Sequence, residues 1–320
     1  MIERTLAACL LVASAALAGC DPTLPAAPPH ANVPPQVSAP PLELCWIEYA
    51  TDNQPGNYGL AGSSDKFAWN LTFSGLLVRH PRGHVLIDVG NSTHFDEETE
   101  TSGFTARRLQ KSFQGAGTRV ATAPDALRAI GEDPARLAGI VISHIHADHA
   151  GGVMDLPGVP VLLSAEEAAF AEHERDNGTF DVLRAEALNI ASRARPVHFS
   201  GGPYENFDRS FDLYGDGAIV FVPLFGHTPG SMGTFVNRSS AERYFHVGDA
   251  VNVVEAIEKR RGKSFLLAIT DHDTGSAERV VAKLTQLHAQ EPRLVFVPAH
   301  DRSAWIHAFG APGRCMPARR

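Results

Sequence analysis

Residues 143–152 read Ser-His-Ile-His-Ala-Asp-His-Ala-Gly-Gly and place His144, His146, Asp148 and His149 within six positions. Neutral imidazole nitrogens and carboxylate oxygens are the donors that suit zinc and similar divalent ions. Three imidazoles and a carboxylate this close together, beside paired glycines, are not typical of an ordinary surface or core. The cluster therefore predicts a metal-dependent enzyme whose remaining ligands come from elsewhere in the chain.

Three more polar residues each follow a predicted strand, and strand ends are where layered folds of helices and sheets place their chemistry. They are His227 after residues 218–225, Asp249 after 243–247 and His300 after 294–298. Within the first cluster, the alternation of a strand lets His144 and His146 point the same way. We therefore expect all four segments to converge on one metal site.

Taken together, these motifs resemble the metallo-β-lactamase superfamily. The resemblance rests on the HxHxDH sequence at 144–149, Gly-His-Thr-Pro-Gly at 226–230, Gly248-Asp249, His300 and Leu-Ile-Asp-Val-Gly at 86–90, and it spans roughly residues 42–305. It implies an α/β (α+β layered) fold, in which an αβ/βα sandwich of two mixed sheets is flanked by helices. It also implies a two-metal site at one edge of the sandwich.

The resemblance assigns ligands to two divalent ions, for which zinc is expected and manganese or iron are the alternatives, since oxygen and nitrogen ligands of this kind accept several ions. The first ion would take His144, His146 and His227, the second would take Asp148, His149 and His300, and Asp249 would bridge them. Two ions about 3.5–4 Å apart can share a hydroxide that is a nucleophile near neutral pH. Asp148 is also expected to orient the attacking water. Asp88 and His246 are expected to support the site rather than to bind metal.

The chemistry within the superfamily is narrowed by three positions. The bridging Asp249 counts against the lactamase branches, and His146 stands where the flavo-diiron oxidoreductases carry glutamate. The pattern is most similar to the acyl-homoserine lactonase branch, but Asn252 occupies the position of a tyrosine that binds the lactone carbonyl there. An amide can also donate a hydrogen bond, although it is shorter than a phenol. We expect hydrolysis of a small ester or lactone, with Asp148 and Asn252 as catalytic candidates.

Two alternatives stay open. The first is a glyoxalase II-like thioesterase or a phosphodiesterase, for which the basic residues within 259–263 could bind an anionic substrate or could be a solvated helix end. The second, from a different class, is a metal-binding lipoprotein without catalysis.

Composition limits the partners. The 320 residues are 44% hydrophobic and 20% charged, and the net charge of −8 is spread without long runs. Nucleic-acid binding requires a basic face, so the expected partner is a small-molecule substrate. The sequence leaves the oligomeric state open.

The N-terminus is typical of an exported protein. Residues 1–19 read as a signal peptide, and Leu-Ala-Gly-Cys ending at Cys20 resembles the lipobox of bacterial lipoproteins. Asp21 resembles a signal that retains such lipoproteins in the inner membrane, facing the periplasm. An ordinary secretory signal is the alternative. Residues 20–41 carry eight prolines and read as an extended tether, and 42–320 as one hydrolase domain, so membrane contact is expected through the lipid anchor only.

Two thiols remain in the domain, Cys45 and Cys315, one near each end. In an oxidising compartment they could form a disulfide, and two separate free thiols are the alternative.

The elements that must position these residues follow from hydrophobic patterning. Strands are expected at 42–49, 71–79, 84–89, 139–143, 161–163, 207–213, 218–223, 231–237, 243–247 and 294–298, with 71–79 and 84–89 forming a hairpin. Helices are expected at 104–113, 124–130, 165–176, 179–195 and from an N-cap at Ser276 to Gln290, and a loop at 90–102.

Overall fold

The structure is a computed structural model that describes residues 22–38, 40–63, 68–100, 104–113, 117–177 and 182–318. The predicted signal peptide, the lipobox cysteine Cys20 and Asp21 lie outside the described residues.

The first sheet has the strand order β13-β1-β2-β3-β5-β6-β7, with β4 also paired to β1. Its strands are β1 (Glu43–Pro55), β2 (Ala68–His80), β3 (Gly83–Ile87), β4 (Thr118–Arg119), β5 (Gly139–Val141), β6 (Val161–Ser164), β7 (Ala194–Val197) and β13 (Cys315–Met316). The predicted hairpin is confirmed, because β2 and β3 pair antiparallel around a two-residue turn. From β3 to β7 the strands are parallel, so β5 delivers the histidine cluster at the carboxyl edge of the sheet.

The second sheet has the order β12-β11-β10-β9-β8. Its strands are β8 (Phe211–Asp212), β9 (Ile219–Pro223), β10 (Met232–Asn237), β11 (Arg243–Gly248) and β12 (Val295–Pro298). Because β11 and β12 run parallel, the residues that follow both strands emerge at the same edge.

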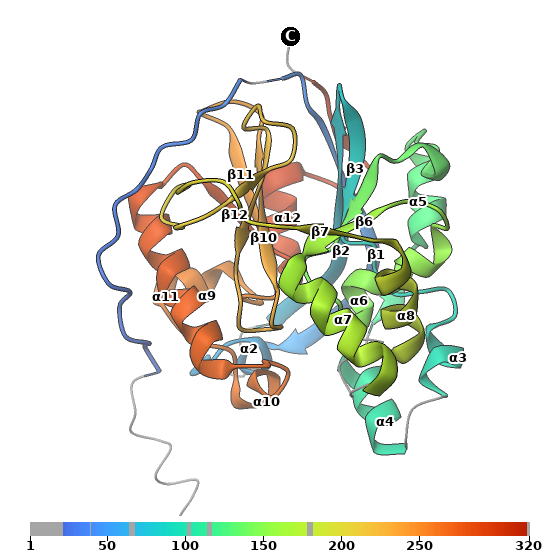
Figure 1. Ribbon diagram of the computed structural model, residues 1–320. Coiled ribbons are helices and arrows are strands. Elements are labelled where there is room, and N and C mark those ends of the chain that lie inside the picture. Colours follow the sequence, from blue (N-terminus) through green and yellow to red (C-terminus); the bar gives the residue numbers. More distant parts are fainter. Residues whose placement is uncertain are drawn as a thin grey trace, which may run out of the picture.

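Helices cover the outer faces of both sheets, as Figure 1 shows, with α5, α7 and α8 on one side and α9 and α11 on the other. The longer helices are α4 (Phe104–Phe113), α5 (Ala123–Ala129), α7 (Ala165–Asn177), α8 (Arg184–Arg193), α11 (Thr274–Gln290) and α12 (Arg302–Phe309). The shorter ones are α2 (Gly56–Gly59), α3 (Phe95–Thr99), α6 (Ala147–Ala150), α9 (Val254–Lys259), α10 (Phe265–Ala268) and the 3-10 turns Pro134–Arg136 and Gly151–Asp155. The expected αβ/βα sandwich is confirmed. None of the helices in the described ranges is long and apolar enough to cross a bilayer.

The core follows from the two-residue period of the strands. In β1, Leu44 and Trp46 join a buried cluster with Phe221 of the second sheet, which fills the space between the sheets. The alternate residues Cys45 and Ile47 join the cluster on the other face.

The proline-rich segment lies along the surface of the domain. Leu24 N donates to Arg260 O at 2.8 Å, and Ser38 N donates to Asp216 O at 2.8 Å. Between these ends Val33 forms an isolated bridge with Glu205. Over residues 22–38 the segment is therefore attached to the domain and does not stand away from it as the expected tether would (Figure 1).

Some element bounds differ from expectation. The loop expected at 90–102 contains α3, and the strand expected at 207–213 is reduced to β8. The helix expected at 179–195 begins at Arg184, and α11 is capped by Asp273, whose side chain accepts from Ser276 N, so Ser276 is not its N-cap. Asp and Ser are both good N-caps, and α11 is capped by Asp273, which comes earlier in the chain than Ser276.

Candidate metal centre

The histidine cluster leaves the edge of the first sheet and is buried. Ile142 and Ser143 follow β5, and His146 then serves as the residue before α6, with Asp148 and His149 inside that helix. All four metal-binding candidates of the cluster are less than 9% exposed. Removing so many polar groups from water is costly unless they are bonded to partners or to a cation.

The first group brings together His144, His146 and His227, whose ligand atoms lie within 4.8 Å of one another. His144 Nε2 lies 3.1 Å from His146 Nδ1, and the ring of His227 is 4.6 Å from each of the other two rings. His227 comes from the turn between β9 and β10, so two sheets contribute to this group.

The second group brings together Asp148, His149 and His300, also within 4.8 Å. His149 Nε2 lies 3.2 Å from His300 Nε2, which in turn is 3.4 Å from Asp148 Oδ2. His300 follows β12, as the sequence predicted.

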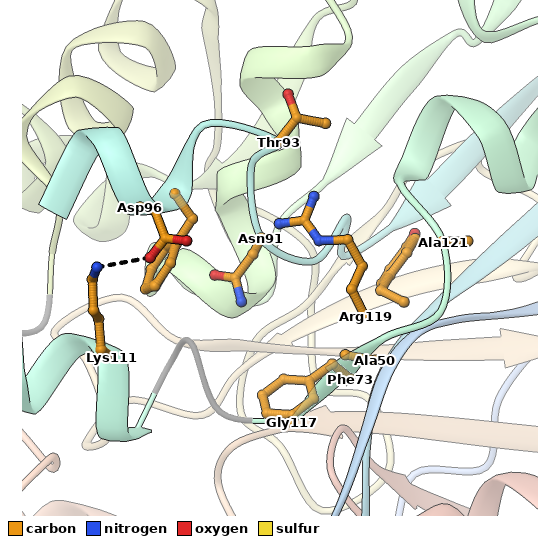
Figure 2. Close-up of a pocket in the computed structure, with 11 residues that line it drawn as sticks. Ala50, Phe73, Asn91, Thr93, Asp96, Lys111, Gly117, Arg119 and Ala121 are labelled. Atoms are coloured by element: carbon orange, nitrogen blue, oxygen red, sulfur yellow. Dashed lines mark ion pairs between the residues drawn. The ribbon is translucent and has the colours of Figure 1, made fainter.

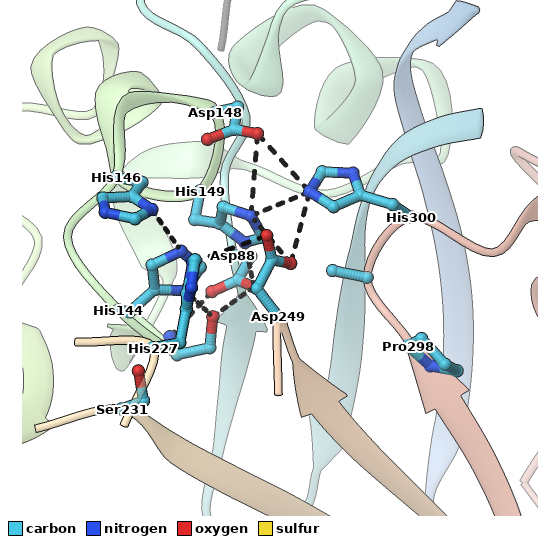
Figure 3. Close-up of polar contacts among 12 residues, drawn as sticks. Asp88, His144, His146, Asp148, His149, His227, Ser231, Asp249, Pro298 and His300 are labelled. Carbon is cyan, nitrogen blue, oxygen red and sulfur yellow. Dashed lines mark hydrogen bonds and ion pairs between the residues drawn. The ribbon is translucent and has the colours of Figure 1, made fainter. Parts of the chain in front are cut away.

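Asp249 lies between the two groups, as Figure 3 shows. Its Oδ1 is 3.2 Å from His300 Nε2 and 3.4 Å from His149 Nε2, whereas its Oδ2 is 3.6 Å from His227 Nε2. One carboxylate therefore faces both groups with different oxygens, which is the geometry that a bridging ligand requires.

The hydrogen bonds of the imidazoles fix which nitrogens face the centre. His149 Nδ1 bonds Asp88 Oδ2 at 2.9 Å, and His300 Nδ1 bonds Thr72 O at 2.9 Å. Both partners are acceptors, so when the rings are neutral both Nδ1 atoms carry the proton and both Nε2 atoms present lone pairs to each other. His227 Nδ1 lies 2.8 Å from the acceptor Asp271 Oδ1 and also 2.8 Å from Lys263 Nζ, and its buried Nε2 has no hydrogen-bond partner among the described residues. Facing lone pairs without a donor fit a cation, and this donor set fits two divalent ions.

The protonation of the two groups differs. Burial lowers the pKa of His144, His146 and His227, and neighbouring imidazoles or Lys263 lower it further. These rings are therefore neutral, as metal binding requires. Burial also disfavours charge on His149 and His300, but Asp249 and Asp148 outweigh it and raise the pKa of both rings.

Asp88 holds His149 from behind. It has a φ of 52°, a left-handed conformation that aspartate tolerates better than most residues. Its carboxylate accepts from Ser143 N and Ser143 Oγ at 2.8 Å each, besides the bond to His149. Burial tends to raise the pKa of the Asp88 carboxyl, but the neighbouring His149 and His246 and the hydrogen bond from Ser143 outweigh burial and hold this pKa below its usual range. His246 is buried with Nε2 3.7 Å from Asp88, so both residues occupy the supporting positions that were expected.

Lys263 and Asp271 support His227, and the sequence reasoning missed this role. Lys263 Nζ lies 2.5 Å from Asp271 Oδ1 and 2.8 Å from His227 Nδ1. The side chains of Lys263 and Asp271 are about 95% buried. The sequence suggests for Lys263 only a place in the basic group at 259–263, which could bind an anionic substrate. That group is dispersed: Lys259 pairs with Glu255 and Arg260 bonds Leu24 O. No local signal marks Asp271, which meets His227 only through the fold.

Glu167, in the first turn of α7, was also missed. Its Oε1 accepts from Ile145 N at 2.8 Å, and its Oε2 accepts from Thr228 Oγ1 at 2.7 Å and Gly230 N at 2.9 Å. One buried carboxylate thus ties the loop of His144 and His146 to the turn of His227. Burial raises its pKa to about 7. The sequence Ser164-x-x-Glu167 has the form of a capping box, which hides this use.

Two other candidates are placed as follows. Asn252 follows β11 and is 4% exposed. Cys45 and Cys315 are joined by a disulfide between neighbouring strands β1 and β13.

Comparison with known proteins agrees with this geometry. Residues 70–300 match the family model described as the Metallo-beta-lactamase superfamily. The chain is 25% identical over 252 residues to the N-acyl homoserine lactonase AttM of Agrobacterium fabrum, covering 74% of this chain and 84% of that protein. It is 27% identical over 252 residues to AttM of Rhizobium johnstonii, with the same coverage.

Solved structures share the fold. An N-acyl homoserine lactone hydrolase with N-hexanoyl-L-homoserine at its metal centre superposes with a TM-score of 0.61 at 18% identity, covering 82% of this chain and 95% of that one. The dizinc lactonase AidC superposes with a TM-score of 0.59 at 18% identity, covering 82% and 89%. With two sheets, two convergent ligand groups and a family match over most of its length, the chain belongs to the metallo-beta-lactamase superfamily.

Proposed function

We propose that this metallo-hydrolase holds two zinc ions and cleaves a small ester or lactone. The observation that carries the proposal is the position of Asp249, whose two oxygens face the two ligand groups. Two bound ions supply a hydroxide near neutral pH and polarise the carbonyl that it attacks.

The chain's own residues position the reactants. Asp249 and the five histidines would hold the two ions, and Glu167, Asp88 and Asp271 keep the ligand-bearing loops in place. Asp148 is proposed to accept a hydrogen bond from the attacking water and orient it, and the support is that its carboxylate belongs to the second group, with Oδ2 3.4 Å from His300 Nε2 (Figure 3). Asn252 is proposed to donate its amide hydrogen to the substrate carbonyl.

The ester or lactone class is supported by the relatives. AttM is an N-acyl homoserine lactonase, and it is similar over most of both chains. The thioesterase alternative loses its specific support, because the basic residues at 259–263 do not form one anion-binding cluster. A non-catalytic metal-binding role is not retained, since the chain belongs to a family of hydrolases.

We further propose that the protein is exported and anchored by a lipid on Cys20 to the periplasmic face of the inner membrane. The support is the lipobox-like sequence and the disulfide between Cys45 and Cys315, since disulfides persist in oxidising compartments. Mass spectrometry of the membrane fraction would show diacylglycerol on Cys20; release of the mature protein without lipid would overturn this proposal.

The test of function is a panel of esters, lactones, thioesters, phosphodiesters and β-lactams with metal-reconstituted protein. We expect close to two zinc ions per chain and turnover of esters or lactones. Asp249→Ala should lower the metal content, and His144→Ala should abolish turnover while circular dichroism stays unchanged. His307→Ala, at an exposed position on α12, is the control and should leave both unchanged. One ion that is unaffected by Asp249→Ala would defeat the two-metal proposal, and turnover of only another bond type would defeat the substrate class.

A further inference from the structure

A separate cavity of about 250 Å³ opens beside the second ligand group, and Figure 2 shows its lining. Its walls come from β1 and β2, the loop after β3, helices α3 and α4, and the short strand β4. None of the seven metal-ligand candidates lines it, so it is a neighbouring space and not the metal site itself.

One aromatic ring separates the cavity from the metal centre. Phe73 lines the cavity and lies edge-on to His300, with ring centroids 5.0 Å apart. The loop after β3 makes a second connection: Val89 N donates to His149 O at 2.8 Å, and Ser92 O, three residues on, accepts from Arg119 Nη2 at 2.8 Å. One short loop therefore bonds both the backbone of His149 and the Arg119 guanidinium, which links the cavity to the second ligand group.

Arg119 is the cation of this cavity that the protein leaves available. Among the described residues its side chain bonds only the neutral carbonyl of Ser92 and forms no ion pair, and the residue is exposed. The second cation, Lys111, is paired with Asp96 at 2.8 Å (Figure 2). A guanidinium with unused N–H groups is a planar fork that matches a carboxylate.

The charge of the lining selects the kind of anion. Its charged side chains are Arg119, Lys111 and Asp96, which together carry one net positive charge. This matches a monoanion, whereas a doubly charged phosphate would leave one negative charge uncompensated. The chain as a whole is acidic, with a net charge of −8, so a local positive charge favours the binding of an anionic substrate at this place.

We propose that Arg119 binds a carboxylate at the end of the substrate remote from the bond that is cleaved. The inference rests on the proposed esterase or lactonase function and narrows its substrate class to esters or lactones that carry a free carboxylate. Phe73 would lie along the aliphatic part between the two ends.

Binding to the zinc-loaded protein tests this directly. The probes are linear dicarboxylates of four to eight carbons. A dicarboxylate of the right length can bind the metals with one end and Arg119 with the other, whereas a monocarboxylate of equal length can bind only one of them. By calorimetry we expect the best dicarboxylate to bind about tenfold more tightly than its monocarboxylate, as for a hydrogen-bonded charge. Arg119→Gln should remove the difference, and Arg119→Lys should restore part of it. Arg128→Gln, which removes the same charge at an exposed site on α5, is the matched control and should have no effect.

Turnover gives the second readout. For monoethyl adipate against ethyl hexanoate, Arg119→Gln should raise KM about tenfold for the charged ester only, with kcat unchanged. Equal binding of mono- and dicarboxylates by the wild type, or equal effects of Arg119→Gln on both esters, would overturn the inference. Absence of all ester turnover would defeat the proposed function, and the binding arm would still decide the role of Arg119.

Discussion

The ammonium group of Lys263 lies 2.8 Å from Nδ1 of His227, and both contact the same carboxylate oxygen of Asp271. The side chains of Lys263 and Asp271 are buried, so the imidazole of His227 is held by an ion pair that has almost no contact with bulk water. Of these two partners only Asp271 can accept a proton from Nδ1, and a proton on Nδ1 is what leaves the Nε2 lone pair free for a metal at the centre. Lys263 neutralises the carboxylate that does this.

The first prediction concerns that ion pair. Lys263→Met should lower the free energy of unfolding by about 3 kcal/mol, because it leaves a buried carboxylate without its cation. Asp271→Asn should cost a similar amount, and the double variant should cost less than the two together. Urea denaturation of the metal-free protein measures all three. Lys259→Met removes a cation whose side chain is 52% exposed, so it should cost less than about 1 kcal/mol. Additive effects in the cycle of Lys263 and Asp271 would contradict the coupling.

The second prediction concerns Asp88. Asp88→Asn keeps a side chain that tolerates the left-handed backbone but weakens the acceptor behind His149. Affinity for the second ion should fall about 10- to 100-fold while that for the first stays within a few-fold. Competition with a chromophoric chelator resolves the two steps. The control is Asp216→Asn, because Asp216 makes the same kind of bond to His80 at the far end of β2, and this variant should leave both metal affinities unchanged. Equal weakening of both ions by Asp88→Asn would show that Asp88 acts on the fold as a whole.

The third prediction concerns Glu167. Burial raises its pKa from 4.5 to about 7, so the folded protein binds more protons than the unfolded chain between these values. Stability should therefore fall as pH rises from about 4.5 to 7, by roughly 3 kcal/mol from this group. Glu167→Gln should remove that slope, as measured by denaturation of the metal-free protein at several pH values. Parallel pH profiles for the wild type and the variant would show that Glu167 does not titrate in this range.

The fourth prediction concerns metal loss in acid. Asp249 and Asp148 raise the pKa of His149 and His300 despite burial, whereas burial lowers that of His144, His146 and His227. A proton competes with a metal for the same lone pair, so acid should remove the second ion at a higher pH than the first. Metal analysis after dialysis at decreasing pH should pass through a plateau of about one ion per chain. Simultaneous loss of both ions, or loss of the first one alone, would contradict the order.

Much of the fold could be predicted from local pattern. The hairpin of β2 and β3 was visible as two apolar runs around a four-residue polar break, and α4 and α7 as helical segments. The bounds that were missed, such as β8 and the cap of α11, depend on pairing and capping choices that several residues could satisfy. The path of residues 22–38 along the domain could not be read from composition, because proline-rich segments are extended whether or not they pack.

The sequence by itself determined the ligand chemistry. His144, His146, Asp148 and His149 are close in the chain, and each of the other three follows a strand, so residue type and spacing were enough to predict a metal site. Only the tertiary structure decided how the ligands are held. Asp271 behind His227 and Glu167 between two loops come from segments distant in sequence. Such supporting contacts need one well-placed atom and no motif, so they become visible only when the sheets bring the segments together.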